Sequence, residues 1–322
     1  MMRYIALLMT LAVGLAGCGQ SQAVREEKAV SAVLKLGGKV IRDEKLPGRP
    51  IIEVNMSGSK VTNSDLKDLK ELKGLQTLVL SYTPITDAGM KDLKEFKGLQ
   101  ALDLNGINIS DTGLKDLKEL KGLKQLSLAQ TQITDAGLRD LTGLKGLREL
   151  NLLETNITDA GLKDLKKLKG LQRLYIGGTQ ITDAGLMDLM ELKCLQGLNL
   201  GCAKITNAAL KYLKEFKDLQ GLNLGRTRIT DAALKDLKEL KGLRWLDLNG
   251  IQITDASLKE LKELEGLQWL SLDGTQITDA GLKELKGLRG LKYLDIGYTK
   301  ITNAGLKDLY QALPNTAIAF PH

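Results

Sequence analysis

The chain repeats a 24-residue unit without any change of frame. From residue 75 to residue 314, ten copies read close to L-x-x-L-x-L-x-x-T-x-I-T-D-A-G-L-K-D-L-K-E-L-K-G. Residues 51–74 form a weaker first copy, with Val54, Met56 and Leu66 at the matching positions. A period of this length is typical of solenoids, in which each unit can bury its apolar face only against its neighbours. The repeat therefore predicts an elongated stack of eleven copies rather than a globule.

Each copy begins with the pattern of a half-buried strand. Leu78 and Leu80 alternate with Thr77 and Val79, which places the two leucines on one face and the other two residues on the opposite face. Because every strand runs in the same direction, neighbouring copies should pair in parallel. Ile318 and the residues around it begin a truncated last strand.

A short helical segment should follow each strand. Thr86 and Asp87 precede the apolar run and are predicted to supply N-capping oxygens, as are their equivalents in the other copies. A glycine ends most copies, and we expect these glycines in the left-handed conformation that commonly stops a helix. They include Gly98, Gly122, Gly146 and Gly170.

These copies resemble the leucine-rich repeat family, whose signature is L-x-x-L-x-L-x-x-N/C-x-L. The resemblance implies an α/β solenoid, or horseshoe, with a parallel β-sheet on the concave face and short helices on the convex face. The I-T-D-A-G-L extension, as in residues 133–138, is most similar to the cysteine-containing subtype known from substrate-recognition subunits of ubiquitin ligases. The copies also resemble repeat proteins of the bacterial envelope.

The sequence departs from that subtype in having a shorter copy and no Asn or Cys at the ninth position. Most copies have threonine there: Thr83, Thr131, Thr155, Thr179, Thr227, Thr275 and Thr299. The other three full copies have Ile107, Ala203 and Ile251.

The first eighteen residues resemble a bacterial lipoprotein signal. Arg3 precedes an apolar run over residues 5–13, and Leu-Ala-Gly-Cys ends at Cys18. This pattern predicts cleavage before Cys18 and its lipidation, which would anchor the chain to a membrane. An ordinary secretory signal is the alternative, and the apolar run is too short to span a bilayer. Gly19 and Gln20 follow the cysteine, which favours the outer membrane or cell surface.

Four segments follow from these patterns. We expect residues 1–17 to be a lipoprotein signal peptide, residues 18–50 a tether and N-terminal cap, residues 51–314 the repeats, and residues 315–322 a closing strand. The charge pattern bears on the choice of partner. The formal net charge is +7, but lysines and acids interleave along each helical segment. A mixed surface of this kind argues against a nucleic-acid partner.

The residue types needed for catalysis are scarce. The only histidine, His322, is the last residue, so it lacks the surrounding packing that orients a general base. The acids that recur every 24 residues, such as Asp135 and Asp159, fit helix starts better than calcium ligation. Cys194 and Cys202 lie at opposite ends of one strand, too far apart for a disulfide. The sequence predicts no enzyme activity, cofactor or metal.

Positions that vary between copies indicate where a ligand could bind. The third position faces the concave side and includes Gly197 and Gly221, two glycines between larger residues. Together with Gly201 and Gly225 they predict a shallow trough. The trough is edged by Arg173 and Tyr175 on one side and by Trp245 and Trp269 on the other. The proposed ligand-binding residues are Arg173, Tyr175, Asn199, Asn223, Trp245, Asp247, Trp269, Asp273, Tyr293 and Asp295.

The width of the trough suits a peptide segment or a sugar chain. The alternative is that Trp245, Trp269 and Tyr293 stack on one another only to stabilise the sheet. The main interpretation is a monomeric, lipid-anchored scaffold of the bacterial envelope that binds a protein or a glycan through its concave face. A structural spacer without a pocket is the first alternative, and a cytosolic substrate adaptor is the second.

Overall fold

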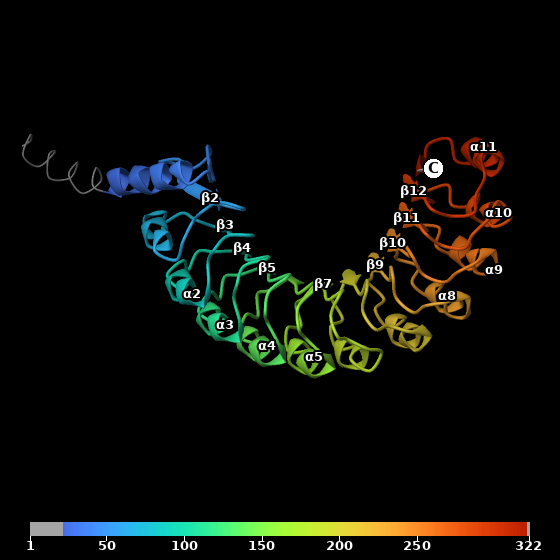
Figure 1. Ribbon diagram of the computed structural model, residues 1–322, viewed down its shortest axis with the longest axis horizontal. Coiled ribbons are helices and arrows are strands. Elements are labelled where there is room, and N and C mark those ends of the chain that lie inside the picture. Colours follow the sequence, from blue (N-terminus) through green and yellow to red (C-terminus); the bar gives the residue numbers. More distant parts are fainter. Residues whose placement is uncertain (1–21, 321–322) are drawn as a thin grey trace, which may run out of the picture. The chain divides into compact units, whose positions relative to one another are not determined.

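The computed structural model describes residues 22–320. The predicted signal peptide, the lipidation site Cys18 and the terminal His322 lie outside these residues. The described residues form two compact units, which are divided between residues 123 and 124, and both are built from strands and short helices. Figure 1 shows each helix following its strand in the same order along the chain. The predicted α/β solenoid is confirmed.

In the first unit, a helix over residues 22–35 precedes an antiparallel pair of strands, β1 and β2. The helix buries Ala29, Val30 and Val33. Strands β2, β3 and β4 then pair in parallel. The elements of this unit are β1 (Lys39–Arg42), β2 (Ile51–Asn55), the 3₁₀ helix η1 (Asp65–Glu71), β3 (Thr77–Val79), α2 (Asp87–Leu93), β4 (Ala101–Asp103) and α3 (Asp111–Leu117).

The second unit contains nine strands, each paired in parallel with the next. The strands are β5 (Gln125–Ser127), β6 (Glu149–Asn151), β7 (Arg173–Tyr175), β8 (Gly197–Asn199), β9 (Gly221–Asn223), β10 (Trp245–Asp247), β11 (Trp269–Ser271), β12 (Tyr293–Asp295) and β13 (Ala317–Ala319). The helices are α4 (Asp135–Leu141), α5 (Asp159–Leu165), α6 (Leu186–Leu189), α7 (Leu210–Leu213), α8 (Asp231–Leu237), α9 (Asp255–Leu258), α10 (Leu282–Leu285) and α11 (Asn303–Ala312). Two 3₁₀ helices, η2 (Asn207–Ala209) and η3 (Leu261–Glu263), complete the unit.

The core lies between the strand row and the helix row. In the copy over residues 147–170, all seven repeating apolar side chains are at most 1% exposed. They are Leu147, Leu150, Leu152, Ile157, Leu162, Leu165 and Leu168. Burial of each such side chain contributes about 1.5–3 kcal/mol before conformational entropy opposes it. This pattern recurs in every full copy, so the interior is continuous within each unit.

The ninth-position threonine has a structural role in this core. The Thr155 hydroxyl donates a hydrogen bond of 2.7 Å to the backbone carbonyl of Leu152, and the Thr155 residue is 4% exposed. Thr83, Thr131, Thr179, Thr227, Thr275 and Thr299 make the same bond. A threonine can therefore replace the Asn or Cys of the general family signature, because its hydroxyl satisfies the carbonyl at the end of the strand.

The glycines that end the copies do not adopt the predicted left-handed conformation. Steric crowding accounts for these glycines instead. A Cβ at Gly122 would lie 3.2 Å from the carbonyl oxygen of Leu99, the first residue of the same copy. The left-handed residue is the eighth of each copy, where the chain leaves the strand. These residues are Gly58, Tyr82, Gly106, Gln130, Glu154, Gly178, Cys202, Arg226, Gly250, Gly274 and Tyr298.

Capping was predicted only in part. The Thr158 hydroxyl accepts a hydrogen bond from the Ala160 N–H and so caps its own helix, as expected. The prediction is wrong for Thr86, which is an N-cap without a side-chain hydrogen bond to its helix. The Asp159 carboxylate does not cap its own helix but binds Thr182 of the next copy, whose hydroxyl accepts from the Ala184 N–H. The repeated aspartates therefore link neighbouring copies, which their position next to the cap did not reveal.

Candidate ligand-binding trough

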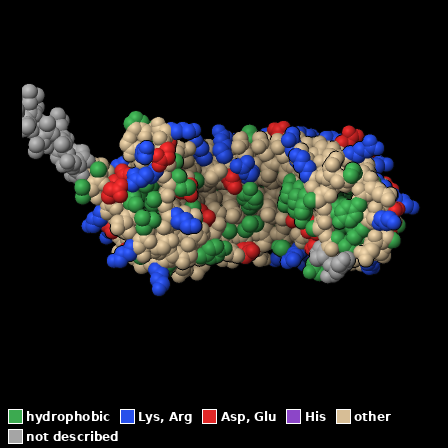
Figure 2. All heavy atoms as spheres, turned by 90° about the horizontal axis from the view of Figure 1, so that it is seen from above, with side chains coloured by type: hydrophobic (Ala, Val, Ile, Leu, Met, Phe, Trp, Pro, Cys, Tyr) green, Lys and Arg blue, Asp and Glu red, His purple; other side chains and the backbone are tan. Residues whose placement is uncertain are grey.

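The third position of each strand forms a row of side chains across the second unit. The parallel register places Arg173 beside Gly197, Gly197 beside Gly221, and Gly221 beside Trp245. Trp269 and Tyr293 continue the row. Figure 2 looks down on the strand side, where hydrophobic side chains form separate clusters between charged ones. Two residues without side chains thus interrupt an otherwise filled row.

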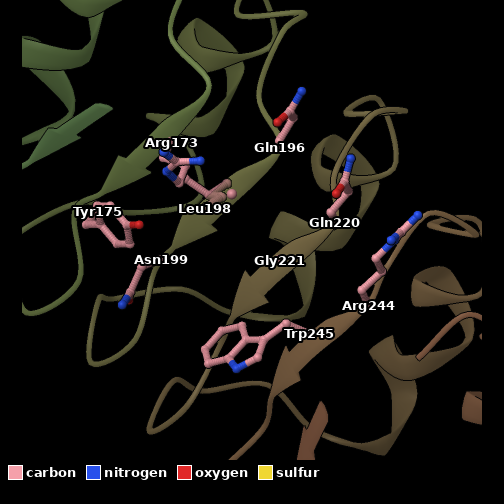
Figure 3. Close-up of a pocket in the computed structure, with 10 residues that line it drawn as sticks. Arg173, Tyr175, Gln196, Leu198, Asn199, Gln220, Gly221, Arg244 and Trp245 are labelled. Atoms are coloured by element: carbon pink, nitrogen blue, oxygen red, sulfur yellow. The ribbon is translucent and has the colours of Figure 1, made fainter. Parts of the chain in front are cut away.

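A cavity of about 500 Å³ lies over these two glycines, and we call it the Arg173 cavity. Figure 3 shows Gln196, Gln220 and Arg244 projecting in a row from the residues that precede strands β8, β9 and β10. The cavity is lined by Arg173, Tyr175, Gln196, Gly197, Leu198, Asn199, Gln220, Gly221, Arg244 and Trp245. The predicted trough therefore coincides with a hollow in the sheet face.

An aromatic ladder forms one wall. The rings of Trp245 and Trp269 stack with centroids 4.7 Å apart and planes 19° apart, and those of Trp269 and Tyr293 stack at 5.6 Å and 9°. Both faces of the Trp269 indole are therefore covered. Trp245 ends the ladder, since its next neighbour in the register is Gly221. One face of the Trp245 indole is left to the cavity.

An ion pair forms the opposite wall. The Arg173 Nε lies 2.8 Å from a Glu149 carboxylate oxygen, and this hydrogen bond raises the pKa of Arg173 above its ordinary value. A Cβ at Gly197 would lie 3.2 Å from the Arg173 Cγ, so the arginine stem leans over Gly197. Burial raises the pKa of the neighbouring Tyr175 above its ordinary value. Both walls are thus held by contacts within the chain.

The fifth position has a structural role that the sequence analysis missed. Oδ1 of Asn199 accepts a hydrogen bond from the Gly201 N–H at 2.9 Å, and Asn223 accepts one from Gly225 at 2.8 Å. Asp247 and Asp295 make the same turn with the residue two places on. These oxygens shape the strand exits, so they have less capacity left for a ligand than expected.

A second cavity of about 400 Å³, here the Asp273 cavity, lies where the strands end. Burial, followed by the nearby Asp295 carboxylate, raises the pKa of Asp273. The cavity is lined by Gly201, Cys202, Asn223, Gly225, Arg226, Asp247, Asn249, Trp269, Ser271, Asp273 and Asp295. It is therefore the acidic part of the trough.

The two cavities together account for nine of the ten predicted residues, while Tyr293 contributes only through the ladder. The sequence did not predict Gln196, Gln220 and Arg244, which occupy the second position of their copies. Nor did it predict Arg226 and Asn249 at the strand exits. The signal of the first three was weak because the second position is polar in all ten full copies, so nothing marked these three residues as different.

Within residues 22–320, no group of three or more His, Cys, Asp or Glu residues could hold a metal ion. Cys194 and Cys202 are exposed free thiols. None of the helices in the described part of the chain has the length and apolar composition needed to cross a membrane.

Comparison with known proteins identifies the repeat. Residues 75–94, 170–190 and 289–309 match the family model described as leucine rich repeat. No curated protein sequence matches the chain. Among solved structures, an internalin (InlF) of Listeria monocytogenes is similar with a TM-score of 0.55 and 22% identity, over 86% of this chain and 91% of the internalin.

A second similar structure is a TDR receptor, with a TM-score of 0.52 and 16% identity over 80% of this chain. The match spans 44% of the receptor. At these identities the likeness concerns the fold. The strand and helix of each copy, the family match and both structures agree, and the chain is an α/β solenoid of the leucine-rich repeat type.

Proposed function

We propose that the chain is a non-enzymatic scaffold that binds a segment of a protein partner in the trough. The observation that carries the proposal is the uncovered indole face of Trp245 beside the glycine floor of the Arg173 cavity. Aromatic faces next to polar groups are favoured in binding sites because they bury large areas with little loss of side-chain entropy. Leucine-rich repeat scaffolds in general bind proteins, which agrees with this assignment.

The fold does not require glycine at residue 221. A Cβ at Gly221 would meet its nearest neighbours, Trp245 Cε3 and the Gln196 carbonyl oxygen, at 3.9 and 4.0 Å, which is ordinary contact. Neither Gly197 nor Gly221 has a positive φ. By contrast, a Cβ at Gly177 would lie 2.5 Å from the Gly201 carbonyl oxygen. The Arg173 stem, 3.2 Å from a Cβ at Gly197, explains the glycine there, whereas the open space at Gly221 has no structural reason, and a ligand supplies one.

The orientation of the rings favours a peptide over a glycan. A sugar chain that stacks along several rings would find only the Trp245 face toward the cavity, because Trp269 has both faces covered. The cavity walls add one arginine at each side and amide groups from Gln196 and Gln220. Side-chain amides both donate to and accept from a peptide backbone.

We further propose a lipid anchor on Cys18 that holds the scaffold in the bacterial envelope, at the outer membrane or cell surface. The support is the arrangement of Arg3, the apolar run and Leu-Ala-Gly-Cys in the sequence. Growth of expressing bacteria with labelled palmitate tests it. The parent chain should take up label and Cys18→Ser should not, while equal labelling of both would contradict the anchor.

A structural spacer is the second candidate, and the ladder of Trp245, Trp269 and Tyr293 favours it. Such a ladder stabilises neighbouring strands without any ligand. Under this alternative, changes in the trough would alter stability but no association.

A capture experiment separates the two candidates. The full chain and an Arg173→Ala/Trp245→Ala variant would each be used to retrieve proteins from bacterial envelope extract. Met187→Ala is the control, because Met187 is an exposed side chain of helix α6, away from the trough. A protein retained by the parent and the control but lost by the trough variant, at equal thermal midpoints, supports binding. Equal retention by all three proteins, or none by any, contradicts it.

A further inference from the structure

We infer that the trough accepts one aromatic side chain of the partner, placed over Gly221 as the next member of the aromatic ladder. This inference rests on the proposed function and names the chemistry that the site recognises. The occupant is an extended peptide segment in which an aromatic residue lies between an acidic and a basic residue.

Spacing is the first argument. Parallel strands lie about 4.8 Å apart, and the register stacks third-position side chains at that interval. The Trp245 and Trp269 centroids are 4.7 Å apart, so strand spacing and ring stacking coincide here. A ring standing over Gly221 would meet the free face of Trp245 at the same distance. The ladder therefore already has the geometry that a fourth ring needs.

The second argument is the shape of the vacant position. Gly221 offers open space up to ordinary contact distance, whereas the Arg173 stem leans over Gly197. A ring over Gly221 would therefore have Trp245 on one side and the Arg173 side chain on the other. The Glu149 carboxylate holds the guanidinium in place. Guanidinium groups stack on aromatic faces, so both walls suit a planar ring.

Charge sets the flanking residues. Arg173 and Arg244 line the Arg173 cavity, and among the described residues Arg244 has no carboxylate partner. At the other end, Asp247, Asp273 and Asp295 line the Asp273 cavity with Arg226. A peptide crossing from one cavity to the other should thus place an acid near Arg244 and a base near Asp273. Such complementarity favours one orientation over the reverse.

The ladder also argues against several aromatic contacts. Trp269 is stacked on both faces and Tyr293 adjoins it, so neither presents a free face toward Gly221. The slot over Gly221 is bounded on its far side by Arg173. A single aromatic anchor is therefore expected, with polar contacts from Gln196 and Gln220 around it.

Filling the slot from within the chain tests the inference. Gly221→Trp would extend the ladder by one ring and occupy the proposed position, and the contact distances at Gly221 allow it to fold. Ala101→Trp is the matched control, because Ala101 has the same third position in strand β4 but lies outside the trough. The probe is a random-peptide display library selected on the full chain, followed by titration of the enriched peptides.

The parent and Ala101→Trp should enrich peptides with an aromatic residue between an acid and a base. Gly221→Trp should bind these peptides at least about tenfold more weakly while its thermal midpoint is equal or higher. Enriched peptides without an aromatic residue, or equal binding by Gly221→Trp, would contradict the aromatic slot over Gly221. Neither result would contradict the binding of a protein segment in the trough. No enrichment by any of the three proteins, together with a glycan array ligand that Gly221→Trp loses, would overturn the peptide assignment and the proposed protein-binding function.

Discussion

The carboxylate of Asp159 accepts two hydrogen bonds from Thr182 of the next copy, one from its backbone N–H at 2.8 Å and one from its hydroxyl at 2.6 Å. The same Thr182 hydroxyl accepts from the Ala184 N–H and caps the helical turn of its own copy. Equivalent pairs are Asp87–Ser110, Asp135–Thr158, Asp183–Thr206, Asp231–Thr254, Asp255–Thr278 and Asp279–Thr302. Helix capping and contact between copies are thus one network.

Replacement of Asp159 by alanine should therefore destabilise the second unit. Asp159→Ala leaves the Thr182 N–H and hydroxyl without their acceptor, at a cost of about 1–3 kcal/mol. Asp159→Asn is the matched control, because Asn207 makes the equivalent pair with Thr230 in this chain. Urea unfolding should give a clearly lower midpoint for the alanine variant than for the asparagine variant. Equal midpoints would show that the carboxylate is dispensable.

The same network makes stability depend on pH. The Thr302 hydroxyl, and then the Thr302 N–H, hold the pKa of Asp279 below its ordinary value. A carboxyl whose pKa is lower in the folded state stabilises that state above the unfolded pKa of about 4, and the contribution is lost as pH falls through the folded pKa. Thermal midpoints should decline below about pH 4, and Asp279→Asn should flatten part of this decline. An unchanged slope would contradict the role of Asp279.

The carboxyl of Asp273 should have the opposite effect on the pH dependence of stability. Burial and the neighbouring Asp295 raise the pKa of Asp273, so its ionised form is disfavoured in the folded state. A raised carboxyl pKa weakens stability above that pKa and has no such effect once the group is protonated. Asp273→Asn should therefore raise the thermal midpoint slightly at pH 7 and leave it unchanged near pH 3. A lower midpoint at pH 7 would mean that the carboxylate makes a contact that outweighs the repulsion.

The ninth-position hydroxyl should contribute to stability at every copy that has it. Thr155→Val keeps the shape of the side chain but leaves the buried Leu152 carbonyl unpaired, which costs about 1–3 kcal/mol. Thr155→Ser retains the hydroxyl and controls for the loss of the methyl group alone. Chemical unfolding of both variants should show the larger loss for valine, and the reverse order would refute the hydrogen bond's contribution.

Glycine should stabilise the folded chain more than glutamate does at the eighth position of a copy. Glu154 has φ +55°, a conformation that costs a residue with a Cβ roughly 1–2 kcal/mol. Glu154→Gly should therefore raise the unfolding midpoint, whereas Glu154→Ala keeps the strained conformation and should not. A stabilised alanine variant would point to the glutamate charge instead of the backbone.

The period of the sequence predicted most of the fold, because every copy repeats the same apolar positions. The positions of Leu150, Leu152 and Ile157 in the core followed directly from alternation and spacing. Contacts between copies could not be derived in this way. Asp159 and Thr158 are adjacent in the sequence, and only the three-dimensional stack shows that they bind different copies.

The candidate site was predicted from the positions at which the copies have different residues. Gly197 and Gly221 stood out because the third position is otherwise larger, and the structure has a cavity over both. The turn-forming role of Asn199 escaped notice because a polar residue at a strand end suits a turn and a ligand equally well. From the sequence, the stacking of Trp245 on Trp269 is only an alternative to binding, yet the structure has both the stack and a cavity beside it. The rings stack, and one indole face remains free.

The most direct test of the account is site-specific photocrosslinking in intact bacteria that express the full chain. A photoreactive amino acid would replace Gln196 in the trough, or Met187 on helix α6 as the control. We predict an adduct with one protein from residue 196, absent from residue 187 and lost when Gly221→Trp fills the slot. Adducts from residue 187 alone, or an adduct from residue 196 that persists with Gly221→Trp, would contradict the central claim that a partner's side chain occupies the trough.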